Sequence, residues 1–210
     1  MKSYLQSCLK SCWIFGGAPF CGNVTLPDNA YIIAADSGYN AVKKLGFTPN
    51  ITLGDFDSLK EKPICGEIMT VAAEKDDTDT MLAVKTALER GYRDISIVGA
   101  IGGRLDHTFA NIQTLAYILR QGGFGRLIGE NDTVELLNAG EYSYQRKDGM
   151  YISLFSYGEA AVLTSRGTKY NLTEHTLDNA FPLGVSNEII DDKCSISVHK
   201  GQLLVIFSKK

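Results

Sequence analysis

Up to about residue 130 the chain alternates short apolar, strand-like runs with amphipathic helical patterns, and this alternation constrains the fold most. The strand-like runs are 11–15, 31–35, 51–53 and 95–98, and glycine or a polar residue follows each of them. Alternating strands and helices are typical of α/β folds with a parallel sheet. Because ligands bind outside the carboxyl ends of such strands, we expect these four strand ends to meet at one site.

Two helices are expected between the strands. Residues 78–90 carry apolar side chains at helical spacing and stop at Gly91, a typical residue just after a helix end. Residues 108–121 repeat this pattern before a pair of glycines. The second helix is expected to bury one face, which consists of Phe109, Ile112, Ala116 and Leu119.

After Asn138 the pattern changes to short apolar runs separated by turn residues. These runs are 151–155, 160–164, 195–199 and 203–207. They predict strands of a small antiparallel β-domain. We therefore expect two domains, an α/β domain with a mostly parallel sheet over residues 1–137 and a smaller all-β domain over residues 138–210.

Composition excludes several classes of protein. The hydrophobic content of 44% is ordinary for a chain that buries a core. The net charge of −3 and the scattered Lys and Arg residues leave no basic stripe for nucleic acid. The five cysteines form no C-x-x-C pair, which indicates a reducing cytoplasm. No stretch is long enough to span a bilayer, and the apolar run near the start is too short for a signal peptide, so no membrane partner is expected.

An acidic pair, Asp55 and Asp57, follows the strand-like run 51–53. Carboxylates two residues apart can point the same way if the backbone between them stays extended. Mg²⁺ is usually held by one or two carboxylates together with waters and substrate phosphates, so the pair is suited to this metal. The alternative interpretation is a turn in which an Asp side chain caps the next segment.

A second acidic group, residues 74–79, lies just before or within the first turn of a helix. The helix dipole favours carboxylates there whether or not they bind a ligand, and Asp76 or Thr78 can cap the helix. Asp76 and Asp79 can instead share one face at the helix start, where they would act together. Both interpretations stay open.

A glycine-rich connection, residues 99–103, leads into Arg104, Asp106 and His107. Glycines let backbone N–H groups approach phosphate oxygens, and the guanidinium of Arg104 can grip a phosphate. His107 can be a cap, a packing residue or a catalytic group. Neither a P-loop nor a G-x-G-x-x-G fingerprint is present. Three acidic groups in one cleft would still be costly without a cation, so together they predict a metal–nucleotide site.

Five ordered segments, spread over nearly the whole chain, resemble those of the thiamine pyrophosphokinase (thiamine diphosphokinase) family. They are Asp36-Ser37-Gly38, Gly54-Asp55-Phe56-Asp57-Ser58, Glu74-Lys75-Asp76-x-Thr78-Asp79, Gly102-Gly103-Arg104-x-Asp106-His107 and Gly184-Val185-Ser186-Asn187-Glu188. The resemblance implies Mg²⁺-dependent transfer of pyrophosphate from ATP to the hydroxyl of thiamine, giving thiamine diphosphate and AMP. It also implies a Rossmann-like N-terminal domain, a C-terminal β-sandwich, and a homodimer with active sites between its subunits.

The resemblance further implies roles for single residues. The magnesium ligands would be Asp55, Asp57 and Asp76. The ATP-binding residues would be Asp36, Ser37, Lys75, Thr78, Arg104, Asp106 and His107. Ser186 and Asn187 would contact the thiamine pyrimidine. The metal ligands count among the catalytic residues, and Asp79 or Asp106 would be the base that takes the hydroxyl proton. The motif leaves the position of Asp77 variable, so no role is implied for it.

Two other functions are compatible with parts of the sequence. Asp55-Phe56-Asp57-Ser58 loosely imitates the nucleophile motif of haloacid-dehalogenase-type phosphatases, which would form an aspartyl-phosphate. A sensor that binds ATP and thiamine without turnover is the other alternative. A calcium-binding EF-hand starting at Asp77 is excluded, because Met81 and Leu82 stand where a ligand and a glycine are needed.

Overall fold

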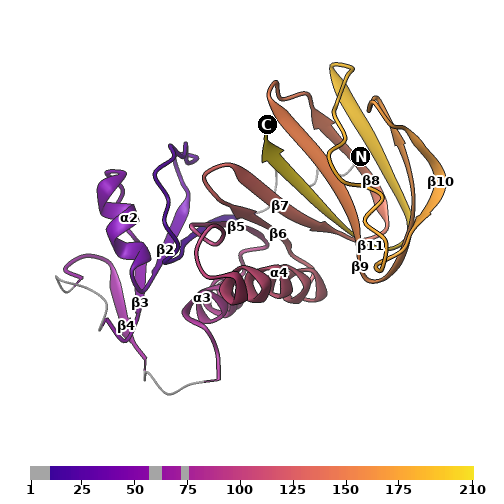
Figure 1. Cartoon of the computed structure of the whole chain (residues 1–210). Helices are drawn as coiled ribbons and strands as arrows, with labels where there is room; N and C mark the ends of the chain where they lie inside the picture. Colours follow the sequence, from indigo (N-terminus) through magenta and orange to yellow (C-terminus); the bar gives the residue numbers. More distant parts are fainter. Residues whose placement is uncertain (1–9, 57–62, 72–75) are drawn as a thin grey trace. The chain divides into compact units, whose positions relative to one another are not determined.

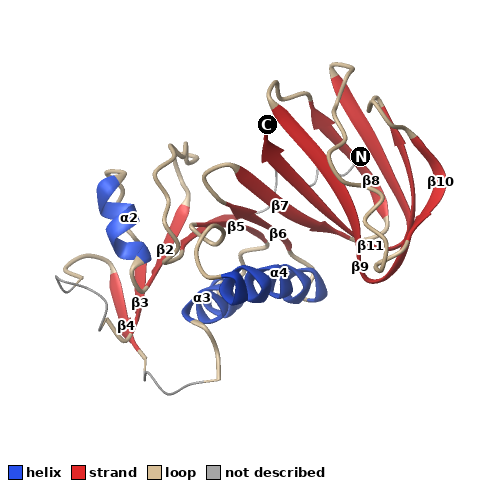
Figure 2. Cartoon of the chain, in the orientation of Figure 1, coloured by secondary structure: helices blue, strands red, loops and turns tan. Residues whose placement is uncertain are grey.

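The computed structural model describes residues 10–56, 63–71 and 76–210 (Figure 1). The chain has a mixed-sheet fold that is mostly strand, with few helices (Figure 2). Its described residues divide into two compact units, residues 10–130 and Asn131–Lys210. None of the helices in these ranges is both long enough and apolar enough to cross a membrane.

The N-terminal unit contains a parallel sheet with the strand order β6-β5-β1-β2-β3-β4. The strands are β1 (Ser11–Phe15), β2 (Tyr31–Ala35), β3 (Ile51–Gly54), β4 (Glu67–Thr70), β5 (Asp94–Val98) and β6 (Phe124–Ile128). The four strands predicted from apolar runs are confirmed, and β4 and β6 are additional. Because β1 pairs with β2 on one side and β5 on the other, the strand order reverses beside β1, where ligands of parallel sheets commonly bind.

Within the described residues, this sheet is accompanied by the helices α2 (Gly38–Lys44), α3 (Asp79–Glu89) and α4 (Leu105–Arg120). Figure 2 shows α3 and α4 side by side on one face of the sheet and α2 on the other. The connection that contains α2 runs from β2 to β3, whereas those that contain α3 and α4 run across the sheet in the opposite direction, from β4 to β5 and from β5 to β6. Right-handed crossovers in opposite directions place their helices on opposite faces. The helix predicted at 78–90 is confirmed, with the hydroxyl of Thr78 accepting from the N–H of Met81 at 3.1 Å.

The second predicted helix differs from the structure in its start and in its buried face. α4 begins at Leu105, three residues before the predicted start, because residues 105–107 carry no buried apolar side chain that would announce it. The predicted face was wrong at Phe109, which is 61% exposed, whereas Ile112, Ala116 and Leu119 are partly buried. The side chains that α4 buries are Asn111, Thr114, Leu115 and Ile118. Two of these are polar, so an apolar pattern alone could not identify the face.

The turn between β2 and α2 is fixed by close backbone packing. Asp36 has a left-handed backbone (φ 48°), and its N–H donates to the carbonyl oxygen of Leu53 at 2.7 Å. A Cβ on Gly38 would lie only 1.9 Å from the carbonyl oxygen of Phe15. The glycine in Asp36-Ser37-Gly38 therefore lets α2 start directly against the end of β1. As a result, the carboxyl ends of β1, β2 and β3 are held together.

The C-terminal unit is antiparallel, as predicted. It contains β7 (Asp132–Leu137), β8 (Gly140–Gln145), β9 (Met150–Arg166), β10 (Leu172–Leu177) and β11 (Lys193–Lys209). β11 pairs with β9 along most of its length, and with β8 and β7 along its first and second halves. β7 belongs to this unit, which therefore begins at Asn131. The domain boundary at 137/138 stays a prediction.

The prediction of four separate short strands in the C-terminal unit was wrong. Runs 151–155 and 160–164 both lie in β9, while 195–199 and 203–207 both lie in β11. Gly158 and Gly201, which resemble turn residues in the sequence, have positive φ within these strands. The pairing of β11 with β9 shifts register between Val198 and Gln202, so a local irregularity accommodates the glycine without ending the strand.

The packing at Gly38 leads to a stability prediction. Gly38→Ala places a methyl group against the Phe15 carbonyl, which belongs to a central strand and cannot retreat, so we expect a loss of about 3 kcal/mol. Gly122→Ala is the control. Its backbone is left-handed (φ 74°), which strains an alanine, but the added Cβ meets no atom within 4 Å, so we expect the free energy of unfolding to fall by about 1 kcal/mol. Urea unfolding measures both, and equal stability of the two variants would contradict the close-approach argument.

Candidate active site

A cavity of about 570 Å³ opens at the carboxyl ends of β1, β2 and β5, next to the starts of α3 and α4. This volume suits a small-molecule ligand. The lining residues are Gly17, Ala18, Pro19, Ala35, Asp36, Ser37, Asp77, Thr78, Asp79, Thr80, Gly99, Ala100, Gly103, Arg104, His107, Thr108 and Asn111. Three of the four predicted strand ends therefore meet here.

The cavity brings together predicted site residues from three motifs that are far apart in the sequence. They are Asp36, Ser37, Thr78, Asp79, Arg104 and His107. Asp55, Asp76 and Asp106 belong to the described residues but do not line the cavity. Asp57 and Lys75 lie outside the described residues. The role of each of these residues stays a prediction.

The acidic segment after β3 does not have the extended backbone that the sequence argument assumed. Phe56, between the two carboxylates of the motif, has a left-handed backbone with φ 62°. Asp55 nevertheless directly follows Gly54, where an added Cβ would lie 3.1 Å from the Cα of Asp36. Asp36 and Asp55 thus come from adjacent strand ends, although only Asp36 lines the cavity.

The start of α3 presents a row of polar side chains to the cavity. Thr78 is the N-cap, which decides between the two caps considered from the sequence, and Asp79 follows in the first turn. The ammonium of Lys85, further along α3, donates to both carboxylate oxygens of Asp77, at 2.8 Å and 2.6 Å. This hydrogen bond raises the pKa of Lys85, so the lysine stays charged at neutral pH.

The start of α4 is organised by an ion pair between Arg104 and Asp106. The Nε of Arg104 donates to one carboxylate oxygen of Asp106 at 3.1 Å, and a terminal nitrogen of the same guanidinium donates to the other oxygen. The backbone N–H of His107 donates to Asp106 at 2.9 Å. The bond from Arg104 holds the pKa of Asp106 below its ordinary value. Asp106 is consequently a weaker proton acceptor than an ordinary aspartate.

Sequence reasoning missed Asn111, which lines the cavity from α4. It is 7% exposed, and its amide nitrogen donates to the carbonyl oxygen of Ala100 at 2.8 Å. This bond ties α4 to the loop after β5. The only available signal was a polar residue inside an amphipathic helix pattern, which by itself does not distinguish a buried position from an exposed one.

In the C-terminal unit, Asn187 is buried and its amide is engaged within the protein. Its Oδ1 accepts from the N–H groups of Tyr170 (3.0 Å) and Glu188 (2.8 Å). Its Nδ2 donates to the carbonyl oxygen of Tyr170 at 2.8 Å. Its backbone also exchanges two hydrogen bonds with Ile152. The side chain of Asn187 thus holds the backbone of Tyr170 from both sides.

Ser186 differs from its neighbour in exposure. It is exposed, has a left-handed backbone (φ 58°), and its N–H donates to the hydroxyl of Ser153 at 3.0 Å. Since Asn187 is buried and Ser186 is not, Ser186 is the one of the two whose side chain a ligand can reach without rearrangement.

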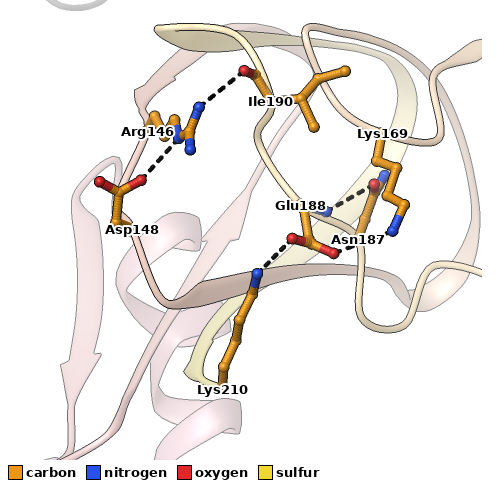
Figure 3. Close-up of polar contacts among 7 residues, drawn as sticks. All are labelled: Arg146, Asp148, Lys169, Asn187, Glu188, Ile190 and Lys210. Atoms are coloured by element: carbon orange, nitrogen blue, oxygen red, sulfur yellow. Dashed lines mark hydrogen bonds and ion pairs between the residues drawn. The ribbon is translucent and has the colours of Figure 1, made fainter.

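Charged side chains secure the segment that follows Asn187 (Figure 3). The carboxylate of Glu188 accepts from the ammonium groups of Lys169, at 3.4 Å, and Lys210. The bond from Lys210 is the main reason that the pKa of Glu188 lies below its ordinary value. Arg146 donates to Asp148 and to the carbonyl oxygen of Ile190. Segments far apart in the sequence are thereby joined around Asn187.

Comparison with known proteins identifies the family. The family model for the thiamin pyrophosphokinase catalytic domain matches residues 24–123, and that for the thiamin pyrophosphokinase vitamin B1 binding domain matches residues 142–203. A Bacillus subtilis thiamine pyrophosphokinase is 33% identical over 184 residues, which cover 84% of this chain and 86% of the relative. The chain belongs to the thiamine pyrophosphokinase family.

Solved structures agree with this assignment. The crystal structure of thiamine pyrophosphokinase from Bacillus subtilis has a TM-score of 0.89 at 30% identity, covering 96% of this chain and 100% of that one. The thiamin pyrophosphokinase from Geobacillus thermodenitrificans has a TM-score of 0.83 at 27% identity, covering 95% and 98%. The resemblance inferred from five ordered motifs is confirmed, and with it the prediction that the chain is a thiamine diphosphokinase enzyme.

Thiamine pyrophosphokinase motifs imply a magnesium ion, and the donor chemistry of the described residues fits one. Asp55 and Asp76, the two predicted ligands among the described residues, carry carboxylate oxygens, the hard donors that Mg²⁺ prefers. Within residues 10–56, 63–71 and 76–210, no group of three or more His, Cys, Asp or Glu side chains could hold a metal ion. Such a group is not required, because one or two carboxylates together with substrate phosphates commonly suffice.

The contrast between Asn187 and Ser186 leads to a second stability prediction. Asn187→Ala removes three side-chain hydrogen bonds and leaves the N–H and C=O of Tyr170 without these partners, so we expect a loss of about 2 to 3 kcal/mol. The matched control, Ser186→Ala, changes an exposed side chain and is expected to cost about 0.5 kcal/mol or less. Urea unfolding followed by circular dichroism tests both; equal midpoints would show that the Asn187 amide has no structural role.

Proposed function

We propose that this chain transfers a pyrophosphoryl group from ATP to the hydroxyl of thiamine, giving thiamine diphosphate and AMP, with Mg²⁺ as cofactor. The observation that carries the proposal is the cavity itself. It collects Asp36, Asp79 and Arg104 from three family motifs at the carboxyl end of a parallel sheet. Family membership makes thiamine and a nucleotide the substrates to test first.

ATP would bind in this cavity. The starts of α3 and α4 both border it, and the positive end of a helix dipole favours phosphate there. The guanidinium of Arg104, oriented by Asp106, would bind phosphate oxygens. Helices on both faces of the parallel sheet also support a Rossmann-like description of the N-terminal unit, and the antiparallel strands of the other unit support a β-sandwich.

Asp55, Asp57 and Asp76 would hold the magnesium ion. When bound, the metal offsets negative charge on the phosphates of ATP. The protein's own contribution to transfer is to fix the substrates in line and to present complementary charge. The thiamine hydroxyl oxygen forms a bond to the β-phosphorus, the bond from that phosphorus to the oxygen bridging it to the α-phosphorus breaks, and AMP leaves.

Of the two candidate bases, Asp79 is the better supported for accepting the hydroxyl proton. It lines the cavity, whereas Asp106 does not. The ion pair with Arg104 also weakens Asp106 as a proton acceptor. Asp106 would instead orient Arg104, so the two aspartates would have different tasks.

Thiamine would be recognised by the C-terminal unit, where the vitamin B1 binding family model matches residues 142–203. The exposed Ser186 would contact the pyrimidine, while Asn187 would act by holding the segments around it. The family resemblance further leads us to propose a homodimer with active sites between its subunits, located in the cytoplasm.

The activity is tested by incubating the purified chain with ATP and Mg²⁺, with and without thiamine. We expect AMP and thiamine diphosphate in equal amounts, and only when thiamine is present. A sensor would bind both compounds without releasing AMP. Trapping of an aspartyl-phosphate, with release of inorganic phosphate, would favour the phosphatase alternative.

Asp55→Asn tests the metal assignment. It replaces a carboxylate by a neutral amide of the same size, so the fold should persist while turnover at ordinary Mg²⁺ falls by about 100-fold or more. The rate of AMP formation is measured across a Mg²⁺ titration, with circular dichroism as the check on folding. Near-normal activity at ordinary Mg²⁺ would remove Asp55 from the metal site.

A further inference from the structure

Asp77 occupies a cavity-lining position to which neither the motif nor the proposed chemistry gives a role. It lies one residue before the N-cap Thr78 and lines the cavity with Thr78 and Asp79. Asp36, at the end of β2, also lines the cavity. A polyphosphate entering this cavity therefore approaches several acidic side chains of the protein, which oppose its binding.

The carboxylate of Asp77 forms an ion pair with Lys85. Lys85 donates to both of its oxygens, at 2.8 Å and 2.6 Å, from the same helix that Asp79 begins. The two side chains are 32% and 35% exposed, so solvent screens the pair only in part. Lys85 itself does not line the cavity, so it acts there through Asp77.

The pair is not explained by the stability of α3. A carboxylate near a helix start is already favoured by the helix dipole. Ion pairs between partly exposed groups usually contribute little to folding. The distinctive property of this pair is its location, since the acidic partner lines the cavity and the basic partner does not.

We infer that Lys85 is a positioning residue that compensates the charge of Asp77 and so allows the cavity to bind a nucleotide polyphosphate. The inference rests on the proposed function, because it takes ATP as the ligand of the cavity. With Lys85 in place, Asp77 lines the cavity while the ammonium group of Lys85 offsets the negative charge of Asp77. Without Lys85, the carboxylate of Asp77 would present its uncompensated negative charge to an anionic ligand in the cavity.

The test measures binding of a non-hydrolysable ATP analogue with Mg²⁺ to the full chain by isothermal titration calorimetry at low salt. Lys85→Met keeps most of the apolar stem but removes the charge, and we expect the Kd to rise about fivefold. The defect should shrink as salt is added, because salt screens the uncompensated carboxylate. In steady-state assays, the KM for ATP should rise by a larger factor than kcat falls.

The double variant Asp77→Asn with Lys85→Met separates charge compensation from a purely structural clamp. Because it also removes the negative charge, it should bind the analogue about as tightly as the wild type does, within about twofold. If the ion pair had only a structural role, this variant would still lack the pair and would bind the analogue as weakly as Lys85→Met does. If the double variant binds as weakly as Lys85→Met, or if Lys85→Met changes the Kd less than about twofold, the inference is overturned.

Arg90→Met is the matched control. Arg90 lies at the other end of α3, and its ion pair with Glu67 is similarly exposed but lies away from the cavity. The Kd of the Arg90→Met variant for the analogue should stay within about twofold of the wild-type value. A loss of affinity equal to that of Lys85→Met would overturn the inference. A wild-type chain that binds the analogue but forms no AMP would overturn only the proposed turnover. A wild-type chain that binds no nucleotide would overturn both proposals.

Discussion

The candidate site depends on the close meeting of three strand ends around β1. β1 pairs with β2 and β5, and the lack of a side chain at Gly38 lets α2 start against the Phe15 carbonyl. The left-handed backbone of Asp36 is held by a hydrogen bond to the end of β3. Strain of this kind persists only where surrounding packing enforces it. The same packing therefore creates the cavity and aims a carboxylate into it.

Much of this arrangement was accessible from the sequence, because its signals are local. Apolar runs ending at glycine or aspartate located the strands that bear the site, and Thr78 was among the expected caps. Interactions that join distant residues were not accessible. Asn111 is recognisable as a cavity residue only in the structure, where it lines the cavity and its amide bonds to Ala100. The Gly201 region of β11 continues as strand because β9 pairs on both sides of it.

The spacing of the acidic residues predicts only a collective metal–nucleotide site, and single roles come from the family resemblance alone. The structure distinguishes several of these aspartates by their partners. Asp106 is bound to Arg104, Asp77 is bound to Lys85, and Asp79 begins α3 on the cavity wall. The bond from Arg104 lowers the pKa of Asp106, and a carboxylate paired with a cation repels an anionic ligand less than an uncompensated one does. A sequence motif records only that aspartates stand at these positions, whereas the side chain facing each one determines what it can do.

Two adjacent residues of one motif, Ser186 and Asn187, likewise differ in their surroundings. Asn and Ser both offer hydrogen bonds, and in the sequence Ser186 and Asn187 are equivalent candidates for contact with thiamine. The amide of Asn187 is already engaged by Tyr170 and Glu188, and breaking those bonds in a buried place would oppose any new contact. Ser186 is exposed, and its backbone is fixed by Ser153. Under the proposed function, this motif would therefore combine a residue that contacts thiamine with one that holds the surrounding segments in place.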